Sequence, residues 1–160
     1  ADHKNIKFLI AGHGNKMPSV RQAAERLPNV RICDFLTGAA FEHAVAASSC
    51  GIVSLERGLT GMCAPSKYYS YLQGGLPIIA VTEANSYLAR EAQKERVGKA
   101  VLVGDGNSLA AEILALYASP IEVQEMSVRA ENLYQAKYQM SIALDKYLIL
   151  LRKILGEKHE

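Results

Sequence analysis

Several features are missing from the sequence, and each absence excludes a class of protein. No stretch approaches the ~18 uncharged apolar residues of a membrane-spanning helix, and the opening residues do not form a signal peptide, so we expect a cytoplasmic protein. Cys33, Cys50 and Cys63 include no C-x-x-C pair, which favours buried thiols in a reducing compartment over disulfide bonds or structural zinc. The net charge of +2 is too small and too dispersed to predict nucleic acid as a partner.

The remaining composition is that of an ordinary globular domain. The chain has 160 residues, 49% of them hydrophobic and 21% charged, with no internal repeat and no low-complexity tract. This length suits one domain with a sizeable core, so we expect a single Rossmann-like domain over residues 1–160.

Short apolar runs alternate with segments of helical spacing. The candidate strands are 7–11, 30–35, 51–55, 77–81 and 99–103. The candidate helices between and after them are 17–27, 39–48, 65–73, 86–95 and 107–118. This alternation predicts an α/β fold: a doubly wound parallel sheet of about five strands with helices on both faces.

After Pro120 the pattern changes to a C-terminal pair of helices, about 121–137 and 140–155. The last helix places Leu144, Leu148 and Leu151 on one face. We expect this face to pack on the sheet or on a neighbouring domain. Binding to a membrane surface is the weaker alternative, because the polar face is only modestly basic.

The first strand runs into a glycine turn with the spacing Gly12-x-Gly14. Met17 stands where a dinucleotide-binding fingerprint needs its third small residue, which argues against a nicotinamide dehydrogenase. The two glycines allow close approach of a ligand to the backbone, although a solvated polar turn explains them equally well. His13 has no second ligand at metal-binding spacing, so we expect no metal.

The next two loops contain further candidates for ligand binding. Asp34 and Phe35 lie near the carboxyl end of the second strand, where buried strand residues without any ligand are the alternative interpretation. The long loop after the third strand holds Glu56, Thr60 and Gly61, and long loops at the carboxyl edge of a parallel sheet often bind substrate. Solvated surface charge explains Glu56 about as well.

The segment Pro65-Ser66-Lys67 opens a short helix, and it is the clearest chemical signal in the chain. Proline suits the first turn of a helix, and Ser66 can cap it. The amides of Ser66 and Lys67, the helix dipole and the lysine ammonium then converge on one spot, which predicts an anion site that suits a phosphate or diphosphate. Ser70 lies on the same face one turn later.

Taken together, these motifs resemble one known family. The matching letters run in family order, as FLIAGHGN, NVRICDFL, FEHAVAASSCGIVSL, PSK, YLQGGLPIIA, VGKAVLVGDGNSLAAEI and a terminal helix pair. The chain resembles the C-terminal, nucleotide-sugar-binding half of a GT-B glycosyltransferase, closest to the family-4 retaining group.

The resemblance implies a function and a role for each loop. The chain would bind a nucleoside diphosphate sugar, with no metal or other cofactor, for transfer of the sugar to a saccharide or lipid-linked acceptor in polysaccharide or glycoconjugate biosynthesis. The backbone from Cys33 to Phe35 would meet the nucleobase, the amides of Ser66 and Lys67 the diphosphate, and the loop from Glu56 to Gly61 the sugar.

The chain departs from the family pattern in two ways. The family carries two glutamates eight positions apart, and Met62 and Ser70 stand at those positions here. Ser70 is neutral and short, so it would hold a ribose less firmly. The segment that precedes FLIAG in the family and the N-terminal acceptor domain are also missing, so we expect a fragment of a two-domain enzyme, inactive by itself. Peripheral membrane association of the whole enzyme stays open.

Two other functions fit the same pattern. The first is a nucleotide-sugar epimerase of GT-B fold. The second is a non-catalytic flavodoxin-like binding or regulatory module, although the first strand ends in AGHGN and lacks the acidic cluster of a receiver domain.

Overall fold

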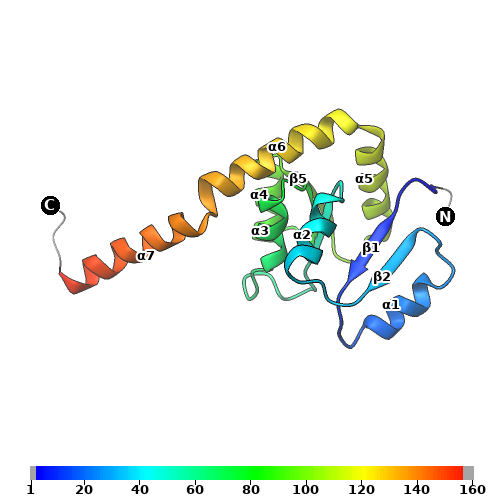
Figure 1. Ribbon diagram of the computed structural model, residues 1–160, viewed down its shortest axis with the longest axis horizontal. Helices are drawn as coiled ribbons and strands as arrows, with labels where there is room; N and C mark the ends of the chain where they lie inside the picture. The colour runs from blue at the N-terminus through cyan, green and yellow to red at the C-terminus, as the bar shows by residue number, and fades with distance from the viewer. Residues whose placement is uncertain (1–2, 157–160) are drawn as a thin grey trace. The chain divides into compact units, whose positions relative to one another are not determined.

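The computed structural model describes residues 3–156, and its internal contacts divide the chain into two compact units, residues 1–47 and 48–160. Figure 1 labels the helices of both units and the strands β1, β2 and β5. Five strands and seven helices lie at the predicted places along the chain, so the predicted alternation of strand and helix is confirmed. The two units are described separately below.

The first unit contains two strand-helix repeats. Its elements in chain order are β1 (Phe8–Ala11), α1 (Met17–Ala24), β2 (Val30–Cys33) and α2 (Gly38–Ala46). β1 and β2 are parallel, in a register that runs from Phe8 opposite Val30 to Ala11 opposite Cys33. The side-chain amide of Asn29 donates to the carbonyl of Ile6 at 3.0 Å and fixes the chain at the start of both strands.

The second unit is built on a parallel three-stranded sheet. Its elements in chain order are β3 (Gly51–Ser54), α3 (Ser66–Gln73), β4 (Ile78–Thr82), α4 (Tyr87–Lys94), β5 (Gly98–Leu102), α5 (Gly106–Ala118), α6 (Pro120–Lys137) and α7 (Met140–Leu155). β4 is the central strand, and both β3 and β5 run parallel to it. A Cβ at Gly98 would lie 1.9 Å from the carbonyl oxygen of Ile78, so the pairing of β4 with β5 requires glycine there.

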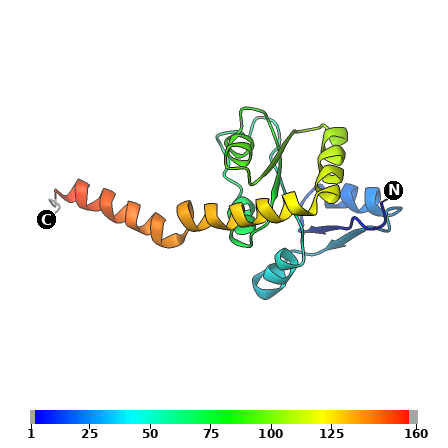
Figure 2. The ribbon, with the colours of Figure 1, turned by 90° about the horizontal axis from the view of Figure 1, so that it is seen from above.

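Local signals fix where the helices of the second unit begin. The hydroxyl of Ser86 caps α4 by accepting from the amide of Leu88 at 3.2 Å. The carboxylate of Asp105 caps α5 by accepting from the amide of Ser108 at 2.9 Å. Pro120 occupies the first turn of α6, and Figures 1 and 2 both show α5 and α6 meeting there at a sharp corner.

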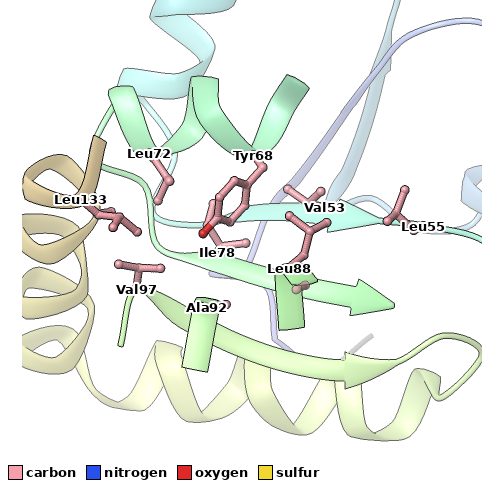
Figure 3. Packing of buried hydrophobic residues seen from close by; sticks show 11 residues of the cluster. Val53, Leu55, Tyr68, Leu72, Ile78, Leu88, Ala92, Val97 and Leu133 are labelled. Atoms are coloured by element: carbon pink, nitrogen blue, oxygen red, sulfur yellow. The ribbon is translucent and has the colours of Figure 1, made fainter. Parts of the chain in front are cut away.

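Helices cover both faces of this sheet, as predicted. Alternate residues of β4 point to opposite faces, so Ile78 and Ala80 belong to one core cluster and Ile79 to the other. The first cluster combines the sheet with α3, α4 and α6, and Figure 3 shows Tyr68 of α3 among its members. The second cluster combines the sheet with α5 and α6.

The strands are hydrogen-bonded as two parallel ladders, where the sequence predicted one sheet. One ladder is β1-β2 and the other is β3-β4-β5, so within residues 3–156 both β1 and β3 have an edge without a ladder partner. The amides of Gly51 and Leu55 donate to the chain segment of β4, and the intervening N–H groups of Ile52 and Ser54 therefore point to the open edge of β3.

Helix α7 differs from the expectation for its apolar face. None of its residues is buried, and Leu144, Leu148 and Leu151 are each about half exposed. The expectation that this face packs on the sheet is therefore wrong for the residues described, and packing on a neighbouring domain stays a prediction. Within residues 3–156 no helix combines the length and apolar character needed to cross a bilayer.

Candidate functional site

The glycine turn after β1 has the open backbone that the sequence predicted. Gly12 and Gly14 have φ values of 148° and 138°, in the region that favours glycine, and a Cβ at either position would meet nothing within 4 Å. The amide of Gly12 donates to the carbonyl of Cys33 at 3.3 Å, which ties this turn to the end of β2. The turn is therefore tied to the end of β2 and has open space beside its two glycines.

The residues after β2 lie beside this turn. The ring of Phe35 is 60% exposed and lies 5.6 Å, centroid to centroid, from the ring of His13. Asp34 is almost fully exposed, and its carboxylate lies 3.5 Å from the guanidinium of Arg21. The structure thus groups Gly12, Gly14, Cys33, Asp34 and Phe35 at the carboxyl ends of β1 and β2, within the first unit; binding of a nucleobase there stays a prediction.

The N-terminus of α3 lies after β3, in the second unit. Pro65 is the N-cap and Ser66 the first helical residue, so Ser66 does not cap the helix as the sequence suggested. The hydrogen bonding of α3 begins at Tyr68, whose N–H donates to the carbonyl of Pro65 at 3.1 Å. The amides of Ser66 and Lys67 precede this bond and carry the positive end of the helix dipole, beside the exposed Lys67 side chain.

The side chain of Ser70 forms a hydrogen bond within α3. Its hydroxyl donates to the carbonyl of Ser66 at 3.3 Å, one turn back along α3. This bond satisfies the hydroxyl within the helix. Ser70 can still accept from a ligand through its oxygen, and that role stays a prediction.

The loop after β3 is anchored to the ends of the next two strands. Thr60 donates through its hydroxyl to Oε2 of Glu83 at 2.8 Å, and the Gly58 amide donates to the same oxygen at 3.2 Å. The Arg57 guanidinium donates to the carbonyl of Val103 at 3.5 Å. Glu83 follows β4 and Val103 follows β5, so the loop is held over the carboxyl edge of this sheet.

Glu83 was not among the residues that the sequence suggested. A carboxylate that directly follows a buried parallel strand is itself a signal of a ligand site, and Glu83 stands in that position after β4. Thr60 and Glu56 belong to a long loop, whereas Glu83 lies in a short turn.

A cavity of about 330 Å³ lies beneath the second half of this loop. Its walls are the loop from Gly61 to Pro65, Tyr69 of α3 and the first residues of α4, and none of the lining side chains is charged. Gly61 therefore opens onto an apolar hollow. The charged groups of the candidate site lie outside it.

A buried carboxylate on α4 is hydrogen-bonded to α3. Glu91 of α4 is 7% exposed and accepts from the hydroxyls of Tyr68 at 2.7 Å, Tyr87 at 2.5 Å and Tyr138 at 2.5 Å. Burial, and then the hydrogen bond to Glu91, raise the pKa of Tyr87 to about 12 and that of Tyr68 above its ordinary range. Tyr68 is fully buried and packs in the core.

Charged and potentially metal-ligating side chains lie near the site of the second unit. Within residues 3–156, His, Cys, Asp and Glu side chains form no group of three that could hold an ion. The positive groups of the second unit's site are the helix terminus, Lys67 and Arg57. Its carboxylates are those of Glu56 and Glu83.

The fold matches that of known structures. In the fold of unit 2, parallel strands alternate with helices on both faces and the candidate groups follow the carboxyl ends of the strands. The chain has the fold of one half of a GT-B glycosyltransferase, as two solved structures show.

The comparisons with individual proteins agree with this class. The crystal structure of WaaG, a glycosyltransferase involved in lipopolysaccharide biosynthesis, matches with a TM-score of 0.68 at 12% identity, over 88% of this chain and 36% of WaaG. The crystal structure of TarM matches with a TM-score of 0.68 at 17% identity, over 90% of this chain and 28% of TarM.

One relative is similar in sequence. The probable glycosyltransferase WbjE of Pseudomonas aeruginosa is 27% identical over 158 residues, which cover 96% of this chain and 39% of WbjE. The chain thus spans well under half of the relative that it matches. No family model matches the sequence. These findings support the resemblance to a GT-B glycosyltransferase domain that the motifs predicted.

Proposed function

We propose that the chain is the donor-binding part of a retaining glycosyltransferase that transfers a sugar from a nucleoside diphosphate sugar to a saccharide or lipid-linked acceptor. The observation that carries the proposal is the N-terminus of α3, where the amides of Ser66 and Lys67 and the lysine ammonium offer positive charge beside a polar loop. The similarity to WbjE and to the WaaG and TarM structures supports it.

The chemistry follows from the charge that develops as the sugar leaves. When the bond between the sugar and the diphosphate breaks, negative charge grows on the departing phosphate. Preorganised N–H donors and a cation stabilise that charge without reorganising during the step. In this proposal Ser66 and Lys67 supply those groups, and no cofactor enters.

The proposal for the whole enzyme includes a second domain. The chain spans 39% of WbjE, 36% of WaaG and 28% of TarM, so we propose that an acceptor-binding domain of the same cytoplasmic protein completes the site. The part described here would bind the donor and would not turn it over. The acceptor would be a saccharide or a lipid-linked saccharide, and a lipid-linked acceptor would bring the whole enzyme to a membrane surface.

Titration with nucleoside diphosphates tests the donor site directly. UDP, GDP and ADP are added separately to an isotope-labelled sample while amide shifts are followed. We expect one of them to shift the amides of Ser66 and Lys67, and Lys67→Ala to weaken that binding about tenfold, by roughly 1.4 kcal/mol. Lys153→Ala on α7 is the matched control and should bind as the parent does. Absence of any shift near Lys67 at millimolar ligand would contradict the proposal.

A further inference from the structure

Glu83 is held rigidly at the carboxyl end of β4. The amide of Ser86 donates to the Glu83 carbonyl at 3.0 Å, and the hydroxyl of Thr82 donates to the same oxygen at 3.1 Å. Ser86 is 2% exposed and caps α4, so the turn that carries Glu83 is tied at both ends to buried structure. The backbone at Glu83 is therefore fixed before any ligand arrives.

The two oxygens of this carboxylate differ in their surroundings. Oε2 accepts from the Thr60 hydroxyl at 2.8 Å and from the Gly58 amide at 3.2 Å. Both bonds end on the same atom, and within residues 3–156 no donor group reaches Oε1. One oxygen thus holds the loop, and the other is left to accept a hydrogen bond from a ligand.

A carboxylate determines which ligand groups can bind beside it. It accepts hydrogen bonds and donates none, and it repels phosphate oxygens. Thr60 uses its only hydroxyl hydrogen on Glu83, so its oxygen is also left as an acceptor. A group rich in O–H donors and without negative charge, such as the sugar of a nucleotide sugar, matches this pair of acceptors.

Charged groups of the candidate site therefore come from two different loops of the second unit. Lys67 and the free amides follow β3 and favour the diphosphate, whereas Glu83 follows β4 and disfavours it. The sequence has Met62 and Ser70 at the positions where the family pattern has glutamates. Glu83 supplies a carboxylate at this edge of the sheet from a different strand.

We infer that Glu83 binds a hydroxyl of the donor's sugar through Oε1 while Oε2 holds the loop from Gly58 to Thr60. This inference rests on the proposed function, because it concerns the sugar of the same donor. It assigns to Glu83 a contribution to affinity for the sugar nucleotide that is absent for the plain nucleoside diphosphate.

The test compares pairs of ligands that differ only by the sugar. UDP and UDP-glucose, GDP and GDP-mannose, and ADP and ADP-glucose are titrated into the parent chain and into Glu83→Ala and Glu83→Gln, with amide shifts as readout. We expect Glu83→Ala to weaken the sugar nucleotide about tenfold and to change the nucleoside diphosphate less than twofold. Glu131→Ala, at an exposed position on α6, is the matched control.

The glutamine variant separates the two oxygens. Its amide oxygen can still accept from Thr60 and Gly58, so hydrogen exchange of the loop should stay as in the parent, while the second acceptor is lost. We therefore expect Glu83→Gln to keep the loop protected and still to lose affinity for the sugar nucleotide. Glu83→Ala should lose both, and its amide spectrum reports whether it is folded.

The outcomes distinguish this inference from the proposed function. If the parent binds a nucleoside diphosphate at Lys67 but both Glu83 variants bind its sugar nucleotide as tightly as the parent, the inference is wrong and the donor site stands. Equal weakening of the sugar nucleotide and the plain diphosphate would also overturn it. If the parent binds none of the six ligands, the donor site itself is refuted and the inference with it.

Discussion

The hydroxyl of Tyr68 donates a 2.7 Å hydrogen bond to the carboxylate of Glu91, and both residues are buried. This bond joins α3, which carries the candidate anion site, to α4, which follows the loop of Glu83. Two further tyrosine hydroxyls reach the same carboxylate. The site is thus supported by a hydrogen-bonded network that runs from the buried Tyr68 to the half-exposed Tyr87.

Removing the carboxylate should destabilise the chain. Glu91→Ala leaves three tyrosine hydroxyls without their acceptor, and we expect a loss of about 2–4 kcal/mol in the free energy of unfolding. Tyr68→Phe removes one donor and should cost about 1–2 kcal/mol. Urea unfolding measures both, with the exposed Tyr147→Phe on α7 as a control that stays within about 0.5 kcal/mol of the parent. A Glu91→Ala chain as stable as the parent would show that the network contributes nothing.

Stability should fall in alkaline solution. The pKa of Tyr87 is raised to about 12, by burial first and then by its hydrogen bond to Glu91, while an unfolded tyrosine titrates near about 10. Because the folded state holds the proton more tightly, this contribution is complete below pH 10 and is lost as the pH rises from 10 towards 12. Tyr68 and Tyr138 are shifted in the same direction. Unfolding midpoints from pH 8 to 11.5 check the prediction, and a flat profile would contradict it.

The cysteines should differ in their reactivity with thiol reagents. Burial raises the pKa of Cys50 to about 12, so very little of it is thiolate near neutral pH, whereas Cys63 is exposed in the loop before α3. In a Cys33→Ser background, which leaves two thiols, we expect one fast-labelling thiol at pH 7.5, removed by Cys63→Ser, and one slow phase assigned to Cys50. Labelling of Cys50 as fast as that of Cys63 would show that the Cys50 thiol is not buried.

Alanine at position 98 should disrupt the sheet. The new Cβ would lie 1.9 Å from the Ile78 carbonyl oxygen, which is fixed backbone, so we expect a loss above about 3 kcal/mol or failure to fold. Gly106→Ala is the matched control, because it lies at the first position of α5 with open space around it and should be neutral or slightly stabilising. The comparison uses thermal unfolding of the two variants.

Most of the fold could be predicted because its signals are local. The run from Pro77 to Val81 is a buried strand because apolar residues fill both of its faces, and the sequence alone predicts this. Ladder pairing depends on contacts distant in sequence, so the separation of β1-β2 from β3-β4-β5 did not follow from the pattern. The exposure of α7 did not follow either, because an apolar helical face predicts a partner without identifying it.

The candidate site was predicted where the backbone determines the chemistry. The turn of Gly12 and Gly14 and the start of α3 could be recognised from residue types alone. Glu83 and Glu91 could not, because their roles depend on Thr60, Gly58 and three tyrosines brought to them by the fold. The predicted start of α3 was wrong by one residue: Ser66 was expected to cap the helix, and it is the first helical residue.

The open edge of β3 affects which sequences a strand that pairs with it can have. It presents the N–H groups of Ile52 and Ser54 rather than a pattern of side chains. Any strand that pairs there is held by backbone hydrogen bonds. Its residue types can therefore vary, provided that the strand stays extended and apolar enough to be buried. A strand that pairs at this edge is therefore selected by its extended backbone more than by the identity of its side chains.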